Sequence, residues 1–385
     1  MEDLFELRNG YTPSKAVDAF WTNGTIPWFR MEDIRSKGNK LAEAFQKITP
    51  EAVKSGGLFK QNSIILATTA TIGEHAMLIA DSLANQQFTN FKIRKSLECN
   101  YIPDFINYAF YKVDEWCLKN TNSGGLLSVD LKSLVKQPFY APSLLEQNKI
   151  STFLRNLETT IECEHQKLTS LKQIKSACLQ SMFPQEGESV PKVRFKGFNE
   201  EWNKKKLKEI TYKAGIKNKE NLPLESYSIS NEFGFIPQNE QFENGGTMTS
   251  ANKRMYYIVS PNTFAYNPAR INVGSLGYYS GQNNVIVSSL YEVFKTIDGV
   301  NDTFLLYWFK TAIFQRMITE YQEGGVRLYF FYDKLQKCEI KIPSIEEQQQ
   351  IAAYFENLDK QITLQTKRLE KLKQIKSACL DKMFV

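Results

Sequence analysis

The sequence predicts an α+β protein in which two mixed α/β globular domains are separated by two long antiparallel coiled-coil helices, with a pseudo-two-fold internal repeat. The first observation is the repeat itself: residues 142–183 align with residues 343–384 without a gap, 201 positions apart, and both copies contain LKQIKSACL. The second is that short apolar runs bounded by Asn, Gly and Pro mix with helical patterns elsewhere. The predicted boundaries are 1–142 for the first globular domain, 143–184 for the first helix, 185–343 for a linker and the second globular domain, and 344–385 for the second helix.

Each copy of the repeat predicts one long amphipathic helix. Apolar residues follow a 4-3-4 spacing from Ile150 to Met182, and the second copy keeps this phase from Ile351 to Met383. One such helix alone would be typical of a globular core, but two helices of about 38 residues, each about 57 Å long, are too long for that. Because a globular segment precedes each helix, side-by-side pairing makes them antiparallel. Polar residues interrupt the stripe, either setting the register or facing solvent: Glu164, Lys175, Gln365 and Lys376.

Composition limits the classes of protein that fit. The six cysteines form no CxxC pair, and the two histidines leave few ligands for a zinc site. The net charge of +6 permits a polyanionic partner without requiring one. The sequence shows neither a signal-peptide pattern nor an apolar run approaching the length of a membrane span. We therefore expect a cytoplasmic protein that does not bind a membrane.

Motifs for catalysis are weak. A phosphate-binding GxxxxGK[ST] loop is missing from the sequence, and residues 267–270, NPAR, lack the second proline and the aromatic residue of an adenine methyltransferase motif. We interpret NPAR as a turn at the end of a strand, with Arg270 facing a nucleic acid. A nuclease-like set could be assembled from Asp333, Glu339 and Lys341, but alternating charges on an edge strand explain it better. The chain is expected to have no catalytic residues and no metal site.

The segment from residue 185 to 219 is rich in lysine and poor in aliphatic runs. It is a linker and a lead-in to the second domain, and either a solvated connection or a phosphate contact fits it. Residues 190–206 precede Leu207, whereas only residues 1–3 precede Leu4, with which Leu207 is aligned. The two domains therefore begin differently.

Local motifs along the chain resemble one family. They are GYTPSK (10–15), GTIPWFRMEDI (24–34), ATTATIGEHAML (67–78), NQQF (85–88), VRFKGFNEEW (193–202), AYNPARINVGSLG (265–277) and PSIEEQQQIA (343–352). With the domain–helix–domain–helix order, they make the chain similar to the specificity subunit of type I restriction-modification systems. The resemblance implies a non-catalytic chain whose globular domains are target-recognition domains, each for one half of a bipartite DNA site.

The resemblance also implies partners. The helices would hold two adenine-N6 methyltransferase subunits and set the spacing between half-sites, and two motor and nuclease subunits would complete the restriction complex. S-adenosylmethionine, ATP and Mg²⁺ would belong to those subunits, and this chain would carry no cofactor. Two other classes stay open: a coiled-coil scaffold with ligand-binding domains, and a stand-alone DNA-binding regulator without methyltransferase partners.

Recognition of double-stranded DNA needs phosphate contacts and side chains that reach base edges, for which Arg, Lys, Asn, Gln, Ser and Thr in loops are suited. Each such residue is individually typical of a solvated surface, and we expect a subset to touch DNA. Neither the bases read nor the spacer length follows from composition. The candidates in the first domain are Lys15, Arg30, Thr68, Thr69, Thr71, Gln86, Gln87, Asn122 and Ser123. Those in the second are Lys217, Lys219, Lys253, Arg254, Arg270, Asn272, Asn283, Asn284, Arg327 and Tyr329.

Overall fold

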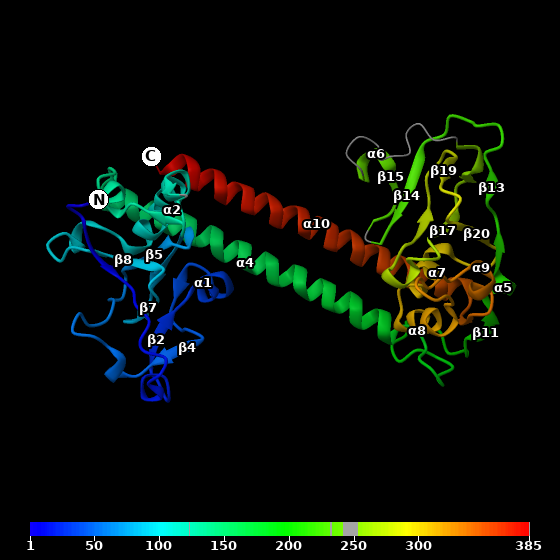
Figure 1. The fold of residues 1–385 in the computed structure, drawn as a ribbon. Coiled ribbons are helices and arrows are strands. Elements are labelled where there is room, and N and C mark those ends of the chain that lie inside the picture. The colour runs from blue at the N-terminus through cyan, green and yellow to red at the C-terminus, as the bar shows by residue number, and fades with distance from the viewer. Residues whose placement is uncertain (123, 232, 242–252, 385) are drawn as a thin grey trace. The chain divides into compact units, whose positions relative to one another are not determined.

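The computed structural model describes the chain except residues 123, 232, 242–252 and 385 (Figure 1). It divides into two compact units: unit 1 comprises Met1–His165 and Lys367–Val385, and unit 2 comprises Gln166–Thr366. The two long helices are α4, Leu144–Ser181, and α10, Ile345–Met383. Each helix therefore contributes one part to each unit, and the predicted α+β class with two long helices is confirmed.

Unit 1 is built on a seven-stranded and a three-stranded sheet. The seven-stranded sheet runs in the order β1–β8–β5–β10–β9, with β6 pairing β5 and β3 pairing β6. Its strands are β1 (Phe5–Asn9), β3 (Lys40–Leu41), β5 (Ile64–Thr69), β6 (Thr71–Leu78), β8 (Phe88–Ile93), β9 (Thr121–Asn122) and β10 (Ser128–Val129). The other sheet, in the order β4–β2–β7, contains β2 (Ile26–Phe29), β4 (Gln46–Ile48) and β7 (Leu83–Ala84).

The helices of unit 1 cover these sheets. The longest helix of its globular part, α2 (Pro103–Lys119), begins with a proline at its first position and is buried on all sides from Phe105 to Phe110. Phe110 packs against the strand residues Phe5 and Phe91. The shorter helices are α1 (Met31–Lys37), α3 (Leu131–Val135) and the 3₁₀ helices η1 (Asp18–Phe20), η2 (Pro50–Ala52) and η3 (Glu98–Asn100).

The described residues of unit 2 form three sheets. The four-stranded sheet β12–β20–β17–β18 is made of Thr211–Lys213, Glu292–Thr296, Thr263–Tyr266 and Leu276–Tyr279. The five-stranded sheet β13–β16–β19–β14–β15 is made of Ile216–Lys217, Tyr257–Val259, Val285–Val287, Ser226–Ser230 and Gly234–Pro237. The third pairs β11 (Asn203–Lys206) with β21 (Glu339–Ile342). The helices are α5 (Leu207–Ile210), α6 (Gln238–Gln241), α7 (Asp302–Trp308), α8 (Ala312–Tyr321), α9 (Tyr332–Leu335), η5 (Lys253–Met255) and η6 (Ile271–Val273).

The two units share a sheet topology. The path β1–β8–β5–β6 of unit 1 corresponds to β12–β20–β17–β18 of unit 2. Corresponding hydrogen bonds show which residues are equivalent at the starts of the two domains. The Met1 amino group donates to the Gln137 carbonyl at 2.9 Å, and the Leu207 N–H donates to the Cys338 carbonyl at 2.9 Å. Gln137 and Cys338 are 201 residues apart, the offset of the repeat. Met1, and not Leu4, is therefore the counterpart of Leu207, which shifts the sequence alignment by three residues.

Within unit 1 the two long helices run antiparallel. Lys376 forms an ion pair with Glu158 at 2.7 Å, and Arg368 forms one with Glu164 at 3.2 Å. From the first pair to the second, the residue number increases on α4 and decreases on α10, as expected for antiparallel helices. In unit 2, Lys175 of α4 is paired with Asp359 of α10. The polar residues Lys175 and Lys376 thus lie between the helices as ion-pair partners.

Within the described part of the chain, no helix is long and apolar enough to cross a membrane. The six cysteines are free, and Cys117 and Cys338 are buried whereas Cys99 and Cys163 are exposed.

Candidate DNA interface

Polar residues from distant parts of unit 1 meet at one end of its larger sheet. Ser128 of β10 pairs with Thr69 of β5 on one side and with Asn122 of β9 on the other. Thr71, the first residue of β6, pairs with Thr69 across the hairpin. Strand register thus places Thr71, Thr69 and Asn122 in one row across the sheet, with Ser128 between Thr69 and Asn122, although more than 50 residues separate the hairpin from Asn122.

The turn between β7 and β8 joins this group. The Thr68 N–H donates to the Gln87 carbonyl at 2.9 Å, which holds the turn next to the end of β5. The exposed Gln86 side chain accepts a hydrogen bond from the Thr12 hydroxyl at 2.5 Å. The loop that contains Thr12 and the candidate Lys15 is therefore tied to the same edge.

Arg30 reaches this edge through a separate strand. The Asn85 N–H donates to the Phe29 carbonyl at 3.0 Å, so Arg30 follows directly after a contact with the β7–β8 turn. Gly10 lies just before Thr12, and a side chain there would put its Cβ 2.1 Å from the Asn85 carbonyl oxygen. The close approach of the chain at Gly10 to the β7–β8 turn therefore requires glycine. We call the resulting surface the unit 1 polar edge; it consists of Thr12, Arg30, Thr69, Thr71, Gln86, Gln87 and Asn122.

The candidates of unit 1 differ in accessibility. Lys15, Gln86 and Asn122 are exposed, whereas Arg30, Thr69, Thr71 and Gln87 are half-buried. Thr68 is only 4% exposed and its hydroxyl lies 2.9 Å from the Thr89 hydroxyl, so it is part of the sheet interior and cannot reach DNA without rearrangement. Arg30 is paired with Glu32. Ser123 lies outside the described residues.

Unit 2 has a corresponding edge. Arg270 and Asn272 lie in the connection between β17 and β18, which corresponds to the β5–β6 hairpin of unit 1. The Phe330 N–H donates to the Pro268 carbonyl at 3.0 Å and so brings Arg327 and Tyr329 to this connection. We call this surface the unit 2 polar edge; it consists of Arg270, Asn272, Arg327 and Tyr329.

Within the unit 2 polar edge, accessibility and stacking differ among the side chains. Arg270, Asn272 and Arg327 are exposed. The Tyr329 ring stacks on Phe331, with the ring centroids 5.4 Å apart and the planes 3° apart.

Basic candidates form a second group in unit 2. Lys217 pairs with Tyr257, and the Asn218 N–H donates to the Tyr256 carbonyl at 2.9 Å. These contacts place Lys217 and Lys219 beside the segment that carries Lys253 and Arg254.

Asn283 and Asn284 do not join that group. They precede Val285, which pairs with Val259 at the end of β16 away from Tyr257. Both are exposed, and the Asn283 carbonyl accepts a hydrogen bond from the Tyr279 hydroxyl at 2.8 Å.

The two edges are related by the repeat. The pairing of Asn122 with Ser128 recurs as the pairing of Glu323 with Tyr329, at the same offset of 201 residues as the helices. Exposed apolar side chains lie between these paired residues: Leu126 is 70% exposed and Val326 is fully exposed. A search of the sequence for charged and polar residues does not find them. The offset of 201 residues between the two halves is the sequence signal that relates the Asn122–Ser128 pair to the Glu323–Tyr329 pair.

Polar side chains of the weak catalytic motifs, and the buried His75 of unit 1, have structural partners. The Asn267 Oδ1 accepts a hydrogen bond from the Ala269 N–H at 3.0 Å, which closes a turn directly after β17 and confirms the predicted strand-end turn. Glu339 is paired with Lys204 at 2.6 Å. The His75 Nδ1 lies 2.5 Å from the Asp114 carboxylate inside unit 1, and burial raises the pKa of Asp114 while His75 lowers it in part.

Comparison with known proteins identifies the class of protein. The model of the type I restriction modification DNA specificity domain matches residues 1–173 and 199–374. The chain therefore belongs to this family.

Particular relatives agree with this assignment. The chain is 47% identical over 136 residues to the specificity subunit of the Escherichia coli type I restriction enzyme EcoprrI, a match that covers 35% of this chain and 34% of the relative. This chain therefore spans about a third of the length of that relative. A match of 21% identity over 410 residues, to the MjaVIII specificity subunit of Methanocaldococcus jannaschii, covers 98% and 89% of the two chains.

Solved structures share the fold. The S subunit of a type I restriction-modification system from M. genitalium superposes with a TM-score of 0.59 at 14% identity, covering 100% of this chain and 94% of the other. The HsdS subunit from Thermoanaerobacter tengcongensis gives a TM-score of 0.52 at 16% identity, covering 99% and 93%. At such identities the likeness concerns the fold alone.

Proposed function

We propose that the chain is the DNA specificity subunit of a type I restriction-modification system, a non-catalytic subunit in which each unit recognises one half of a bipartite site. One observation carries the proposal. A polar edge is built twice from equivalent strand hairpins, but with different side chains: Thr69 and Asn122 in unit 1, Arg270 and Arg327 in unit 2. Equivalent frames with different side chains suit the recognition of two different half-sites.

The side chains suggest which contacts each edge makes. Arginine pairs with guanine through two hydrogen bonds, and asparagine and glutamine pair in the same way with adenine. The exposed Arg270 and Arg327 would therefore favour guanine, and Gln86 and Asn122 adenine. The group of Lys217, Lys219, Lys253 and Arg254 would contact phosphates and supply affinity without sequence preference.

The long helices would serve as the spacer and as the docking surface for partners. Ile174 and Ile375 hold the same place in the two copies of LKQIKSACL, and they are 46% and 38% exposed. A pair of matched, exposed apolar side chains supports the docking of two identical subunits. We propose that these are two adenine-N6 methyltransferase subunits, joined by two motor and nuclease subunits during restriction.

In this proposal S-adenosylmethionine, ATP and Mg²⁺ are held by the partner subunits. The chain itself would contribute recognition, positioning of the methyltransferases and the distance between half-sites.

Co-expression with the methyltransferase subunit of its own system tests the assembly. Native mass spectrometry should give a complex of two methyltransferases per chain, and replacing both Ile174 and Ile375 by Asp should release them, because a buried unpaired charge opposes docking. Replacing the exposed Leu290 of unit 2 by Asp is the matched control. Retention of both methyltransferases by the Ile174→Asp/Ile375→Asp variant would contradict this docking surface.

A further inference from the structure

A loop of the same length occurs in each unit, between two paired residues. In unit 1 it joins Asn122 to Ser128, and in unit 2 it joins Glu323 to Tyr329. Because the residues at both ends are related by the offset of 201, the two loops can be compared position by position. We call them the unit 1 loop and the unit 2 loop.

Burial shows that the two loops return to their units in the same way. Leu127 and Leu328 are related by the offset and are 44% and 43% exposed. Two positions later, Val129 and Phe330 are both buried. The short helices α3 and α9 then begin at corresponding residues. A residue of one loop therefore lies in the same structural frame as its counterpart in the other.

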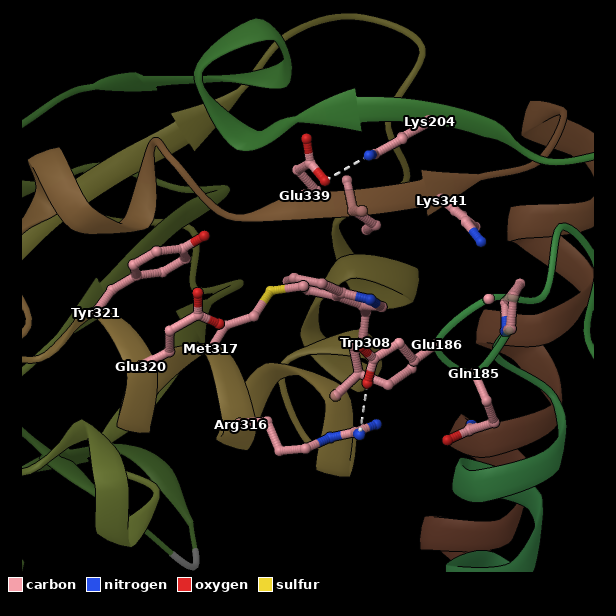
Figure 2. Close-up of a pocket in the computed structure, with 14 residues that line it drawn as sticks. Gln185, Glu186, Lys204, Trp308, Arg316, Met317, Glu320, Tyr321, Glu339 and Lys341 are labelled. Carbon is pink, nitrogen blue, oxygen red and sulfur yellow. Dashed lines mark hydrogen bonds and ion pairs between the residues drawn. The ribbon is translucent and has the colours of Figure 1, made fainter.

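One position in this frame carries different chemistry in the two units. Arg327 of the unit 2 loop is exposed, and its counterpart in the unit 1 loop is Leu126, which is 70% exposed. Arg316 of α8, the helix before the unit 2 loop, is paired with Glu186 at 3.0 Å beside a cavity of about 380 Å³ (Figure 2). Arg327, in contrast, forms no ion pair with any residue that the structure describes. Its guanidinium is thus available to a ligand, whereas Leu126 offers only apolar surface at the same place.

A backbone hydrogen bond holds Leu126 at the unit 1 polar edge. The Ala70 N–H donates to the Leu127 carbonyl at 2.7 Å, which ties the unit 1 loop to the turn between β5 and β6. Ala70 has a φ of 65°, which residues with a side chain rarely adopt. Such a conformation persists only where the surroundings hold it, and this hydrogen bond is one of those contacts. Leu126 therefore lies beside the hairpin that carries the hydrogen-bonding side chains of the edge.

We propose that Leu126 is a specificity-determining residue that contacts the 5-methyl group of a thymine in the half-site of unit 1. The inference rests on the proposed function, in which Arg327 pairs with guanine in the major groove. There the bases present hydrogen-bond donors and acceptors, and thymine alone adds a methyl group. A leucine at the place where the other unit holds a guanine-reading arginine is matched to that methyl group.

The position of Leu126, and not its exposure alone, supports this role. A single exposed leucine is ordinary, because apolar atoms make up much of any protein surface. Leu126 lies among hydrogen-bonding side chains and in the place of an arginine. Opposite a base without the methyl group it would cover a donor or an acceptor without pairing it, which opposes binding. Leu126 would therefore select thymine both by contact and by exclusion.

Replacement of thymine by uracil tests the contact, because uracil lacks only the 5-methyl group. The split motif is first mapped from adenine methylation in cells. A duplex that contains it is then titrated with the complex of the chain and its methyltransferase, and each thymine of the motif is replaced in turn by deoxyuridine. One replacement should weaken binding about fourfold, the value of one buried methyl group.

Variants of the chain assign this effect to Leu126. Leu126→Ala should bind the thymine and uracil duplexes alike at that position, and its exposure means that the substitution leaves the core intact. Leu290→Ala, at a leucine of unit 2 that is 73% exposed, is the matched control and should keep the fourfold difference. Leu126→Arg should prefer a G·C pair at the same position, as proposed for Arg327.

The results that would overturn the inference are distinct from failure of the proposed function. A chain that directs no split motif would contradict the proposed function, and the inference with it. With a split motif present, equal binding of the unchanged chain to all uracil duplexes would overturn the inference alone, as would a fourfold loss that Leu126→Ala retains. Binding that depends on Leu126 but on no thymine methyl group would indicate an apolar wedge between base pairs, and would also overturn it.

Discussion

At the scale of single residues, a tyrosine, a carboxylate and a lysine form the same group in both units. The Tyr108 hydroxyl donates to Glu158 at 2.7 Å, and Lys376 pairs with the same carboxylate at 2.7 Å. In unit 2 the Tyr307 hydroxyl donates to Asp359 at 2.8 Å, and Lys175 pairs with Asp359. Burial and then the carboxylate raise the pKa of both tyrosines, so both stay protonated donors. The lysines are those of LKQIKSACL, which explains why a charge is kept within its apolar stripe.

Removal of either hydroxyl should destabilise its own unit. We expect Tyr108→Phe and Tyr307→Phe each to lower the free energy of unfolding by about 1.5–3 kcal/mol, because each removes one hydrogen bond to a charged group. Urea denaturation followed by circular dichroism measures the loss. Tyr140→Phe, at a position 66% exposed, is the control. Losses no larger than that of the control would show that the groups do not hold the domains to the helices.

Thiol reactivity should separate the cysteines. Burial raises the pKa of Cys117 and of Cys338 to about 12, so that at pH 8 only about one in ten thousand of these thiols is ionised. Because the thiolate is the nucleophile, the exposed Cys99 and Cys163 should be alkylated by iodoacetamide much faster in the folded chain.

Time-resolved peptide mass spectrometry measures these rates. In urea all four cysteines should react alike, and alkylation of Cys338 as fast as Cys163 in the folded chain would contradict the burial.

At the scale of elements, the sequence predicted the parts that depend on periodicity. The 4-3-4 spacing from Ile150 onward and the repeat predicted two long helices, observed as Leu144–Ser181 and Ile345–Met383. The polar edges depend on strand register, which links Thr69 to Ser128 and Asn122 across long stretches of chain. Sequence patterns do not contain that register.

The position along the strand explains why one candidate differs from its neighbour. Both faces of β5 are buried from Ile64 to Thr68, whereas Thr69 is the last residue of the strand and is half-buried. From the sequence alone, Thr68 and Thr69 are equally plausible as DNA contacts. The sequence shows that only the second half has a lead-in, but the packing of its Trp202 against Phe183 and Phe304 is visible only in the folded core.

Lengthening the helices tests the spacer role that we propose for them. Insertion of one heptad after His165 and a matched heptad after Thr366 adds about 10.5 Å of helix, equivalent to about three base pairs. We expect the gap between half-sites to grow while their sequences stay the same. Insertion in α4 alone should put the Glu158–Lys376 pair and the Lys175–Asp359 pair out of register with each other and lower the melting temperature, because the two helices can then no longer form both pairs. A gap unchanged by matched insertions would contradict the spacer role.

At the scale of the whole molecule, affinity and specificity should come from different residues. Lys219→Ala should weaken binding to all DNA sequences and reduce the slope of log K against log salt concentration by about 1, because a phosphate contact releases a counterion. Arg327→Ala should cost about 1–3 kcal/mol and relax the preference at one base position. Titration of the methyltransferase complex with specific and scrambled duplexes, at several salt concentrations, separates the two effects. A uniform loss from Arg327→Ala would assign it to phosphate.

The most direct test of the proposed function is a map of adenine methylation in cells. The chain and its methyltransferase are expressed together, and methyladenine is mapped by single-molecule sequencing for the unchanged chain, for Thr69→Ala/Asn122→Ala and for Arg270→Ala/Arg327→Ala. We expect a split adenine-methylated motif, with the first variant altering one half only and the second variant altering the other half only. The absence of a split motif that depends on the chain, or a change in both halves from one variant, would contradict recognition of one half-site by each unit.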